Sequence, residues 1–304
     1  MDKVIHSVLN KPRSHSISPL TKGYLIMALV LLIWSGFALT TRAIGGSLLT
    51  IADVSLIRFF VPLVLLTPLI PSHFNEIKKI KISDILFIIL GGVPFLFLAA
   101  LGANNAPTAY VGTILAGTSP LFVALLSYVL YRQKISSKRA FTLSLILVGV
   151  VIMVKGHSGH IPDDMMVGVG YLFCAALVWA GYTIGLKRVE LSCFSIAIVV
   201  SYLSFFITLG LVFSGIASSN FGVFSMEDAL PFILIQGLGV GVLATIGFSY
   251  VVSQLGSARA SIVGSISPGL TALLAVPIFN EALSAAIIFG LALTILGVLL
   301  SNRT

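Results

Sequence analysis

Long apolar runs separated by short polar breaks dominate the chain from residue 23 to residue 301. A helix needs about 20 mostly apolar residues to cross the hydrocarbon core of a bilayer. Ten runs reach or approach that length, which predicts an all-α membrane protein with ten transmembrane helices. The predicted spans are 23–42, 50–71, 84–104, 107–131, 138–155, 166–186, 193–216, 229–253, 257–280 and 282–301.

The composition agrees with a membrane environment. Charged residues make up 9% of the chain and hydrophobic residues 58%, whereas soluble domains average about 25% charged residues. The net charge of +8 does not indicate nucleic-acid binding, because the basic residues flank the apolar runs and form no single patch. We expect Cys174 and Cys193 to be free thiols and residues 1–22 to form a cytoplasmic N-terminal tail.

The basic residues predict the orientation, because Lys and Arg favour the cytoplasmic side of a membrane. With the N-terminus inside, 14 of the 18 basic residues fall on cytoplasmic segments, and only Arg42 and Lys155 fall outside. The remaining two, Arg58 and Arg259, lie within predicted spans. We therefore expect a multi-pass protein of the bacterial inner membrane with both termini in the cytoplasm.

Two local sequence patterns occur twice at nearly the same offset. Trp34 and Trp179, each followed by a small residue, Gly and an aromatic residue, lie 145 residues apart. Pro120 and Pro268, each preceded by Ser, lie 148 residues apart within long apolar runs. The chain is therefore predicted to contain two five-helix repeats, residues 23–155 and 166–301.

The two predicted repeats must face opposite ways, because each contains an odd number of spans. The loop after the second span contains three lysines, whereas the matching loop after the seventh contains Glu227 and Asp228 and no basic residue. The loop after the fourth span is also basic, and its match after the ninth contains Glu281. These opposite charges favour inverted topology.

Taken together, these motifs resemble the EamA-type family of the drug/metabolite transporter superfamily. The resemblance also covers the closing glycines Gly149 and Gly297 and the segment 279–283, and it extends over about residues 22–301. It implies a ten-helix transporter of small metabolites, often acting as an exporter. The chain departs from the pattern at Gln133, which stands where the repeat of Glu281 would be, so a role that needs an acid at both turns is in doubt.

Aromatic residues of the first and sixth spans are candidates for the walls of a central cavity. Trp34, Phe37, Trp179 and Tyr182 lie near mid-span, where a purely interfacial belt is less expected. We predict that the two pairs face each other across the pseudo-twofold axis and bind substrate by stacking. Tyr250 and Asn104, near the ends of the eighth and third spans, are further substrate-binding candidates.

The fourth and ninth spans are candidates for pore walls. Each has one helical face of small and weakly polar residues, and such a face suits either a wet cavity or close helix packing. The prolines of the two Ser-Pro pairs are predicted to kink these helices beside the cavity. The face residues named as substrate-binding candidates are Tyr110, Thr113, Ser261 and Ser265, and the predicted kinks are at Pro120 and Pro268.

Two arginines within spans are also candidate binding residues. Arg58 lies about eight residues into the second span, where an intramembrane arginine is expected to have a partner. Asp53 is five positions away on the same helix, which is a poor angle for an ion pair. Arg58 is therefore either a structural or snorkelling residue or a site for a substrate carboxylate or phosphate. Arg259 either anchors at the headgroups or guards the inner mouth.

The predicted function is transport of a small metabolite, such as an amino acid or a similar amphipathic compound, by alternating access and with export as the expected direction. No Asp, Glu or His lies near the middle of a predicted span, which favours weak or absent proton coupling. A proton- or sodium-coupled exporter of drugs or toxic cations and, less favoured, a channel remain alternatives. We expect no enzymatic activity, cofactor, metal or nucleic-acid partner, and a monomer or weak homodimer in the lipid bilayer.

Overall fold

The computed structural model describes residues 18–156, 163–189 and 191–301, and every regular element in these ranges is helical. Most of the predicted tail lies outside them. In the described part, nine helical stretches are long and apolar enough to cross a membrane, and they overlap the first nine predicted spans. A shorter apolar helix, Ala285–Ser301, has 17 residues and overlaps the tenth. The prediction of an all-α membrane protein is confirmed at this level.

Several predicted spans consist of more than one helical element, and two of them include π-helical segments. The elements are α1 (Pro19–Ala43), η1 (Ile44–Gly46), α2 (Ile51–Leu66), η2 (Thr67–Leu69), α3 (Ile70–Ile77), α4 (Ile82–Ile89), α5 (Val93–Asn105), α6 (Thr108–Gly112), the π-helix η3 (Thr113–Gly117), α7 (Ser119–Tyr131), α8 (Ser137–Lys155), α9 (Asp163–Arg188), α10 (Cys193–Phe213), α11 (Met226–Phe232), the π-helix η4 (Ile233–Ala244), α12 (Thr245–Leu255), α13 (Ser257–Gly264), α14 (Ser267–Phe279) and α15 (Ala285–Ser301).

Side-chain caps define where several helices begin. Thr50 caps α2 and Ser225 caps α11, each in a capping box with an aspartate three positions later. Ser136 and Ser192 cap α8 and α10 in the simpler way, by accepting a hydrogen bond from a backbone N–H of the first turn. These hydroxyls satisfy donors that would otherwise have no partner in the helix, so the polar breaks of the sequence fix the helix starts.

The fourth and ninth predicted spans are interrupted at the same relative place. The fourth passes from α6 through η3 into α7, and the ninth is divided between α13 and α14. Pro120 and Pro268 lie in the first turns of α7 and α14, where a missing N–H leaves no helical hydrogen bond unmade. The two helices also end alike, because Arg132 and Asn280 both adopt the left-handed conformation, with φ of 55° and 54°.

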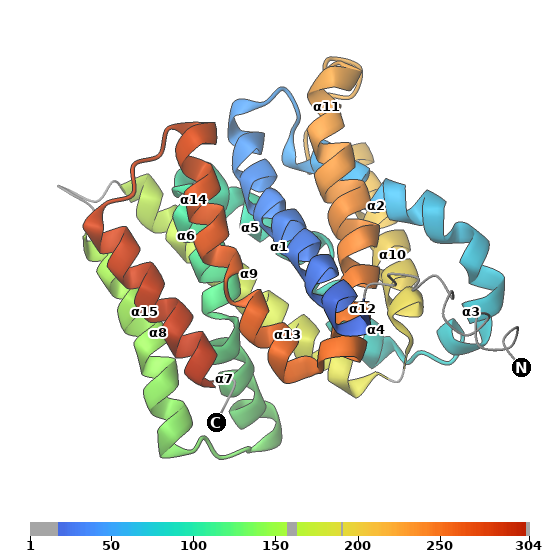
Figure 1. Cartoon of the computed structure of the whole chain (residues 1–304). Coiled ribbons are helices and arrows are strands. Elements are labelled where there is room, and N and C mark those ends of the chain that lie inside the picture. The colour runs from blue at the N-terminus through green and yellow to red at the C-terminus, as the bar shows by residue number, and fades with distance from the viewer. Residues whose placement is uncertain (1–17, 157–162, 190, 302–304) are drawn as a thin grey trace, which may run out of the picture.

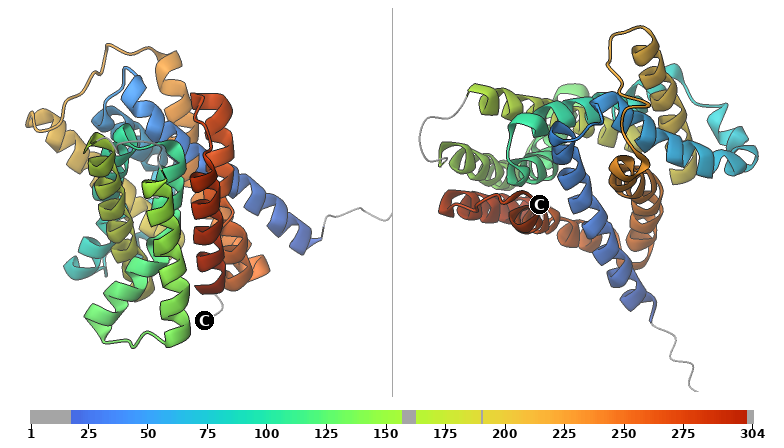
Figure 2. Two further views of the ribbon diagram at one scale, coloured as in Figure 1. Left: turned by 90° about the vertical axis from the view of Figure 1, so that its left-hand side faces the viewer. Right: turned by 90° about the horizontal axis from the view of Figure 1, so that it is seen from above.

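The principal helix contacts join the two halves of the chain. α8 packs along α15 and forms one edge of the bundle, while α2 contacts α10 and η4, and α6 contacts α14 (Figure 1). α1 lies against α12 and η4, and α5 lies against α9. In both views of Figure 2, α1 extends obliquely away from the other helices at its N-terminal end. α1 begins and α15 ends toward the same end of the bundle (Figure 1).

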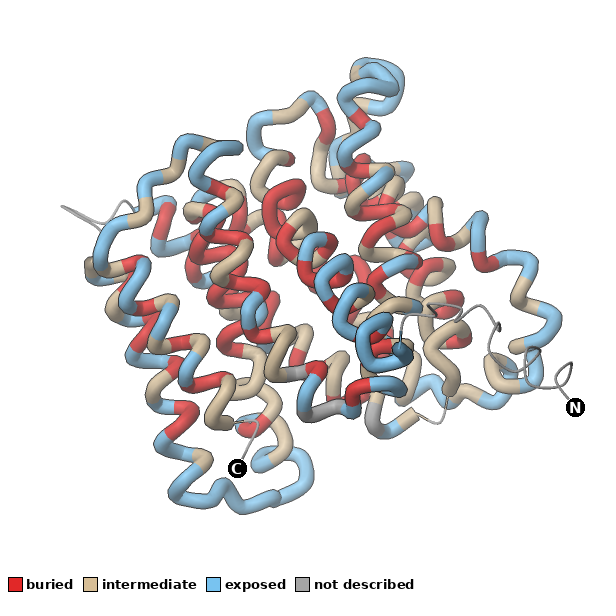
Figure 3. Tube along the Cα trace, viewed as in Figure 1, coloured by how far each residue is buried: buried red, intermediate tan, exposed pale blue. Residues whose placement is uncertain are grey.

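Small residues allow α8 and α15 to pack closely. A Cβ built on Gly149 of α8 would overlap the backbone of α15 at Gly290, and a Cβ on Gly290 would overlap Gly149 in turn. Buried residues concentrate on the sides of the helices that face other helices (Figure 3). Large apolar side chains such as Phe206 and Phe289 are exposed on the outside, where a bilayer would cover them.

Candidate functional site

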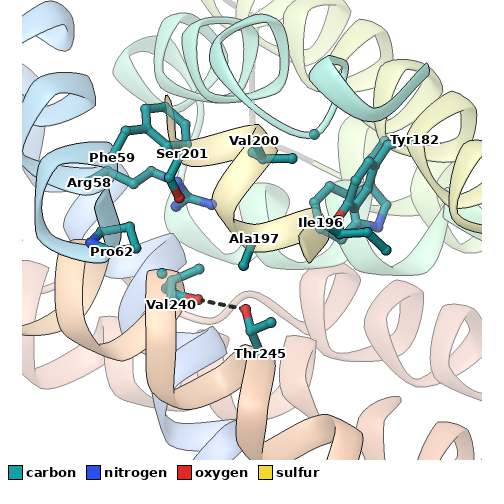
Figure 4. A pocket seen from close by; sticks show the side chains of 13 residues that line it. Arg58, Phe59, Pro62, Tyr182, Ile196, Ala197, Val200, Ser201, Val240 and Thr245 are labelled. Carbon is teal, nitrogen blue, oxygen red and sulfur yellow. Dashed lines mark hydrogen bonds between the residues drawn. The ribbon is translucent and has the colours of Figure 1, made fainter. Parts of the chain in front are cut away.

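A cavity of about 110 Å³ lies where α2, α9, α10, η4 and α12 meet. This is several times the space that one ordered water needs. Arg58 extends from α2 at one side of the cavity and Tyr182 of α9 lies at the other (Figure 4). The lining combines one cationic side chain with aromatic, aliphatic and hydroxyl groups: Arg58, Phe59, Pro62, Gly91, Trp179, Tyr182, Ile196, Ala197, Val200, Ser201, Val240, Gly241 and Thr245.

Arg58 is a buried cation with a neutral hydrogen-bond partner. Its side chain is 7% exposed, and its Nη1 donates to Oε1 of Gln236 on η4 at 2.6 Å. Its guanidinium carbon lies 4.9 Å from the ring centre of Phe37 and 5.7 Å from that of Phe59. Neither salt bridge found among the described residues includes Arg58. Burial of such a charge in a membrane is costly, at about 2.5–3.5 kcal/mol on insertion scales.

Asp53 makes no ion pair with Arg58, although both are on α2. Its carboxylate accepts hydrogen bonds from the backbone and hydroxyl of Thr50 in the capping box of the helix. The same carboxylate accepts from the hydroxyl of Ser219 and the backbone N–H of Asn220 in the connection after α10. Asp53 therefore joins two helix ends, and its charge is directed away from the cavity residues.

Gln236 links Arg58 to α1. Its Nε2 donates to the hydroxyls of Thr40 and Thr41, at 3.0 Å each, while its Oε1 faces Arg58. Gln236 itself is fully buried. The sequence analysis did not identify this residue, although a single amide within the apolar stretch 229–253 is the kind of intramembrane polar group that marks a functional site.

A chain of aromatic contacts crosses the site from α1 to α9. The ring of Phe37 stacks on Phe95 of α5 at 5.8 Å between centroids. Phe95 contacts Trp179 at 4.8 Å, and Trp179 contacts Tyr182 at 5.0 Å. These separations are in the range of favourable aromatic pairs. The structure thus brings together four of the predicted site residues: Phe37, Arg58, Trp179 and Tyr182.

Trp34 lies in a different cluster. It is half-buried on α1, its ring lies 5.1 Å from that of Phe248 on α12, and it packs with residues that include Met27 and Val251. Trp34 does not line the cavity that contains Trp179. The two tryptophans have similar surroundings nonetheless, because each contacts a phenylalanine of the third span in the other half of the chain.

The remaining predicted site residues are spread over the bundle. Tyr110 and Thr113 are fully buried, and their hydroxyls donate to the backbone carbonyls of Met153 and Ala109. The hydroxyl of Ser265 donates to the carbonyl of Ile262 in α13, the helix that precedes it. Three further residues do not line the cavity: Asn104 and Tyr250 are partly buried, and Arg259 is exposed on α13. The side chain of Ser261 is outside the described structure.

One carboxylate joins three elements at the end of the bundle where α1 ends. Glu281, in the connection between α14 and α15, accepts hydrogen bonds from the backbone N–H of Thr108 at 2.8 Å and from its hydroxyl at 2.9 Å. The Nε of Arg42, at the end of α1, lies 3.8 Å from Glu281. We call Arg42, Thr108 and Glu281 the Glu281 cluster. Its hydrogen bonds tie the start of α6 to the α14–α15 connection.

A second, wider cavity of about 400 Å³ lies beside the ends of α7 and α9. Arg188 contributes to it and forms a salt bridge with Asp84 at 3.0 Å. Gln133, which stands at the repeat position of Glu281, also lines it. The other lining residues are Val123, Ser127, Tyr131 and Ile184.

Comparison with known proteins gives a consistent family assignment. The chain is 25% identical over 299 residues, 91% of each chain, to an uncharacterized transporter of Clostridium kluyveri. It is 27% identical over 219 residues to an uncharacterized transporter of Synechocystis sp., covering 70% of this chain and 64% of that protein. A solved crystal structure with 17% identity has a similar fold, with a TM-score of 0.60 over 91% of this chain and 95% of that one. The model of the EamA-like transporter family matches residues 21–155 and 166–303. The chain therefore belongs to the EamA-like transporter family and is a multi-pass membrane transporter.

Proposed function

We propose that the protein is a carrier that moves a small amphipathic metabolite, such as an amino acid or a related compound, through the cavity at Arg58 by alternating access. The observation that carries this proposal is that the cavity is lined from both halves of the chain. Arg58 and Gly91 come from the first half, and Trp179, Tyr182 and Thr245 come from the second. A site at such a junction changes its access when one half moves against the other.

The architecture behind this proposal is ten helices in two inverted five-helix repeats, residues 23–155 and 166–301. The pattern of helix contacts supports it, because several of the principal contacts have a counterpart with the halves exchanged. α1 packs on α12 as α9 packs on α5, and α1 packs on α14 as α9 packs on α7. The pairs α2 with α10 and α8 with α15 are their own counterparts. The left-handed residues Arg132 and Asn280, 148 positions apart, give further support.

The proposed orientation places both termini in the cytoplasm of a bacterial cell, in the inner membrane. The Glu281 cluster then lies at the outer end of the bundle and the wider cavity beside Arg188 at the inner end. A hydrogen-bonded outer end with a hollow inner end is the arrangement expected of an inward-facing carrier. Export, the direction common in the family, would then begin with loading from the cytoplasm.

The cavity chemistry suits an amphipathic cargo with a carboxylate. The guanidinium of Arg58 can bind a carboxylate through paired hydrogen bonds, while the rings of Trp179 and Tyr182 provide a surface for an apolar or aromatic side chain. The lining residues include no carboxylate or imidazole, so we propose a facilitator or an exchanger rather than a proton-driven pump. Uphill accumulation driven by an imposed pH gradient would contradict this part of the proposal.

The two tryptophans of the chain permit a direct test, since only Trp179 lines the cavity. Purified protein carrying Trp34→Phe should retain saturable fluorescence quenching by a transported metabolite from an amino-acid panel. The matched variant Trp179→Phe should lose that signal and show weaker uptake in proteoliposomes. Quenching that persists in Trp179→Phe and is lost in Trp34→Phe would place the substrate elsewhere. Uptake that stays linear with substrate concentration would favour a channel over a carrier.

A further inference from the structure

The hydrogen-bond partner of Arg58 is a neutral amide, and this affects which substrate charge the cavity can accept. We propose that Gln236 is a specificity-determining positioning residue that holds Arg58 without neutralising it, so that the cavity selects organic anions with one carboxylate and an apolar body. The proposal rests on the proposed carrier function and narrows its cargo from amphipathic metabolites in general to those whose only charge is a carboxylate, in place of amino acids. It favours simple carboxylates over zwitterions, neutral amides and ammonium compounds.

The hydrogen bonds of α1 fix the orientation of the Gln236 amide. The hydroxyl of Thr40 donates to the carbonyl of Gly36 at 2.8 Å, and that of Thr41 donates to the carbonyl of Phe37 at 2.6 Å. A hydroxyl has one proton, so both threonine oxygens can only accept from the side chain of Gln236. The NH₂ group must therefore face the threonines, and the amide oxygen must face Arg58.

This arrangement leaves the positive charge of Arg58 in place. One hydrogen bond, from Nη1 to Gln236, is described for the guanidinium, which has five N–H donors in all. The rings of Phe37 and Phe59 lie within cation–π distance and stabilise the cation without cancelling its charge. The cavity is therefore a positively charged site with donors remaining for a ligand.

The rest of the cavity explains why a zwitterion or a cation fits less well. A buried charge requires an opposite charge or full hydrogen bonding. The lining residues provide hydroxyls on Tyr182, Ser201 and Thr245 but no carboxylate, so an ammonium group would enter beside Arg58 without a counter-ion. A ligand with one carboxylate and an apolar tail satisfies both the guanidinium and the aromatic surface.

Gln236→Glu distinguishes this role from a merely structural one. A glutamate keeps the size of the side chain and an oxygen facing Arg58, and the hydroxyls of Thr40 and Thr41 can turn from the α1 carbonyls to donate to its second oxygen. A structural role therefore predicts a folded protein with unchanged binding. Under our proposal the variant folds but forms an internal ion pair that competes with the substrate anion. Gln254→Glu is the matched control, because Gln254 is exposed at the end of α12 and bonds only to the neighbouring Ser253 among the described residues.

The experiment compares four compounds that share a phenyl group: 3-phenylpropanoate, 3-phenylpropanamide, phenylalanine and phenethylamine. Binding is measured by quenching of Trp179 in full-length Trp34→Phe protein, and uptake is measured in proteoliposomes. We expect 3-phenylpropanoate to bind at least tenfold more tightly than the other three. We expect Gln236→Glu and Arg58→Gln to weaken that binding at least tenfold through Kd, with thermal stability of Gln236→Glu retained and Gln254→Glu unchanged.

Three results would overturn the proposal. They are equal or tighter binding of phenylalanine or phenethylamine, undiminished carboxylate binding in a folded Gln236→Glu protein, and no binding of 3-phenylpropanoate at millimolar concentration. Saturable uptake of phenylalanine that survives Gln236→Glu would reject the anion selectivity and leave the carrier function intact. Absence of saturable uptake for every compound of the metabolite panel would instead reject the carrier function itself.

Discussion

The Glu281 cluster leads to a prediction about access to its end of the bundle, which is the outer end in the proposed orientation. If this end must open during transport, the contacts between Glu281 and Thr108 must break in each cycle. Glu281→Gln keeps one of the two acceptor oxygens and removes the charge that strengthens both hydrogen bonds. The variant should therefore favour the outward-open conformation without disrupting either helix.

The size of the effect follows from the hydrogen bonds. Glu281 accepts hydrogen bonds from two donors of Thr108, with shortest distances of 2.8 Å for the backbone N–H and 2.9 Å for the hydroxyl. Hydrogen bonds to charged groups contribute about 1.5–3 kcal/mol against about 0.5–1.5 for neutral ones. The Arg42 contact, at 3.8 Å and partly exposed, adds at most about 1 kcal/mol. If Glu281→Gln removes about 2 kcal/mol of this interaction energy, the equilibrium between closed and open conformations shifts roughly 30-fold toward the open one.

Thiol labelling measures that shift. Ala109 is buried directly after Thr108, so Ala109→Cys in a background lacking Cys174 and Cys193 should react slowly with a membrane-impermeant maleimide. Adding Glu281→Gln should raise the labelling rate by up to the same 30-fold, provided that the parent retains uptake. Glu227→Gln, which changes an exposed glutamate on α11, is the control and should leave the rate unchanged. Equal labelling in Glu281→Gln and its parent would refute the role of the cluster.

Two further predictions concern stability. Gly290→Ala should lower the midpoint of thermal unfolding in detergent by the equivalent of about 1–3 kcal/mol, because its Cβ would overlap the backbone at Gly149. Gly170→Ala is the control, because nothing lies within 4 Å of a Cβ built there. Equal midpoints for the two variants would contradict the packing argument. Thr50→Ala should lower the free energy of unfolding by about 1 kcal/mol, because the cap of α2 is lost. It should leave the Kd of a cavity ligand unchanged, and a higher Kd would show that the cap also affects the site.

The membrane spans could be predicted from the sequence because they depend on local composition alone. The kinks predicted at Pro120 and Pro268 stay predictions, and the structure places each proline in the first turn of the helix that follows an interruption. The hydrogen-bond partner of Arg58 could not be predicted from the sequence. Arg58 and Gln236 are 178 positions apart, and their contact depends on how α2 packs against η4, which no periodicity within either helix reveals.

The tryptophans illustrate the limit of a repeated motif. Trp34 and Trp179 occupy corresponding positions and each contacts a phenylalanine of the opposite half. Only Trp179 lines the described cavity, because the space beside it is bounded by α2 and α10. Repetition therefore predicts similar packing partners, but whether a side chain meets a cavity depends on the sizes of residues contributed by other helices.

The arrangement of the helices is closer to twofold symmetric than the distribution of charged and polar side chains on them. The contact of α2 with η4, which contains Arg58 and Gln236, has its counterpart in the contact of α10 with α4. An offset of 145 to 148 residues relates Arg58 to 203–206 and Gln236 to 88–91, and neither segment contains a charged residue. Under the proposed inverted-repeat architecture, a charged site on one side of the pseudo-twofold axis would give the carrier a single place for a carboxylate. Under the proposed mechanism, the two halves would then rock about one anion instead of passing it between two equivalent sites.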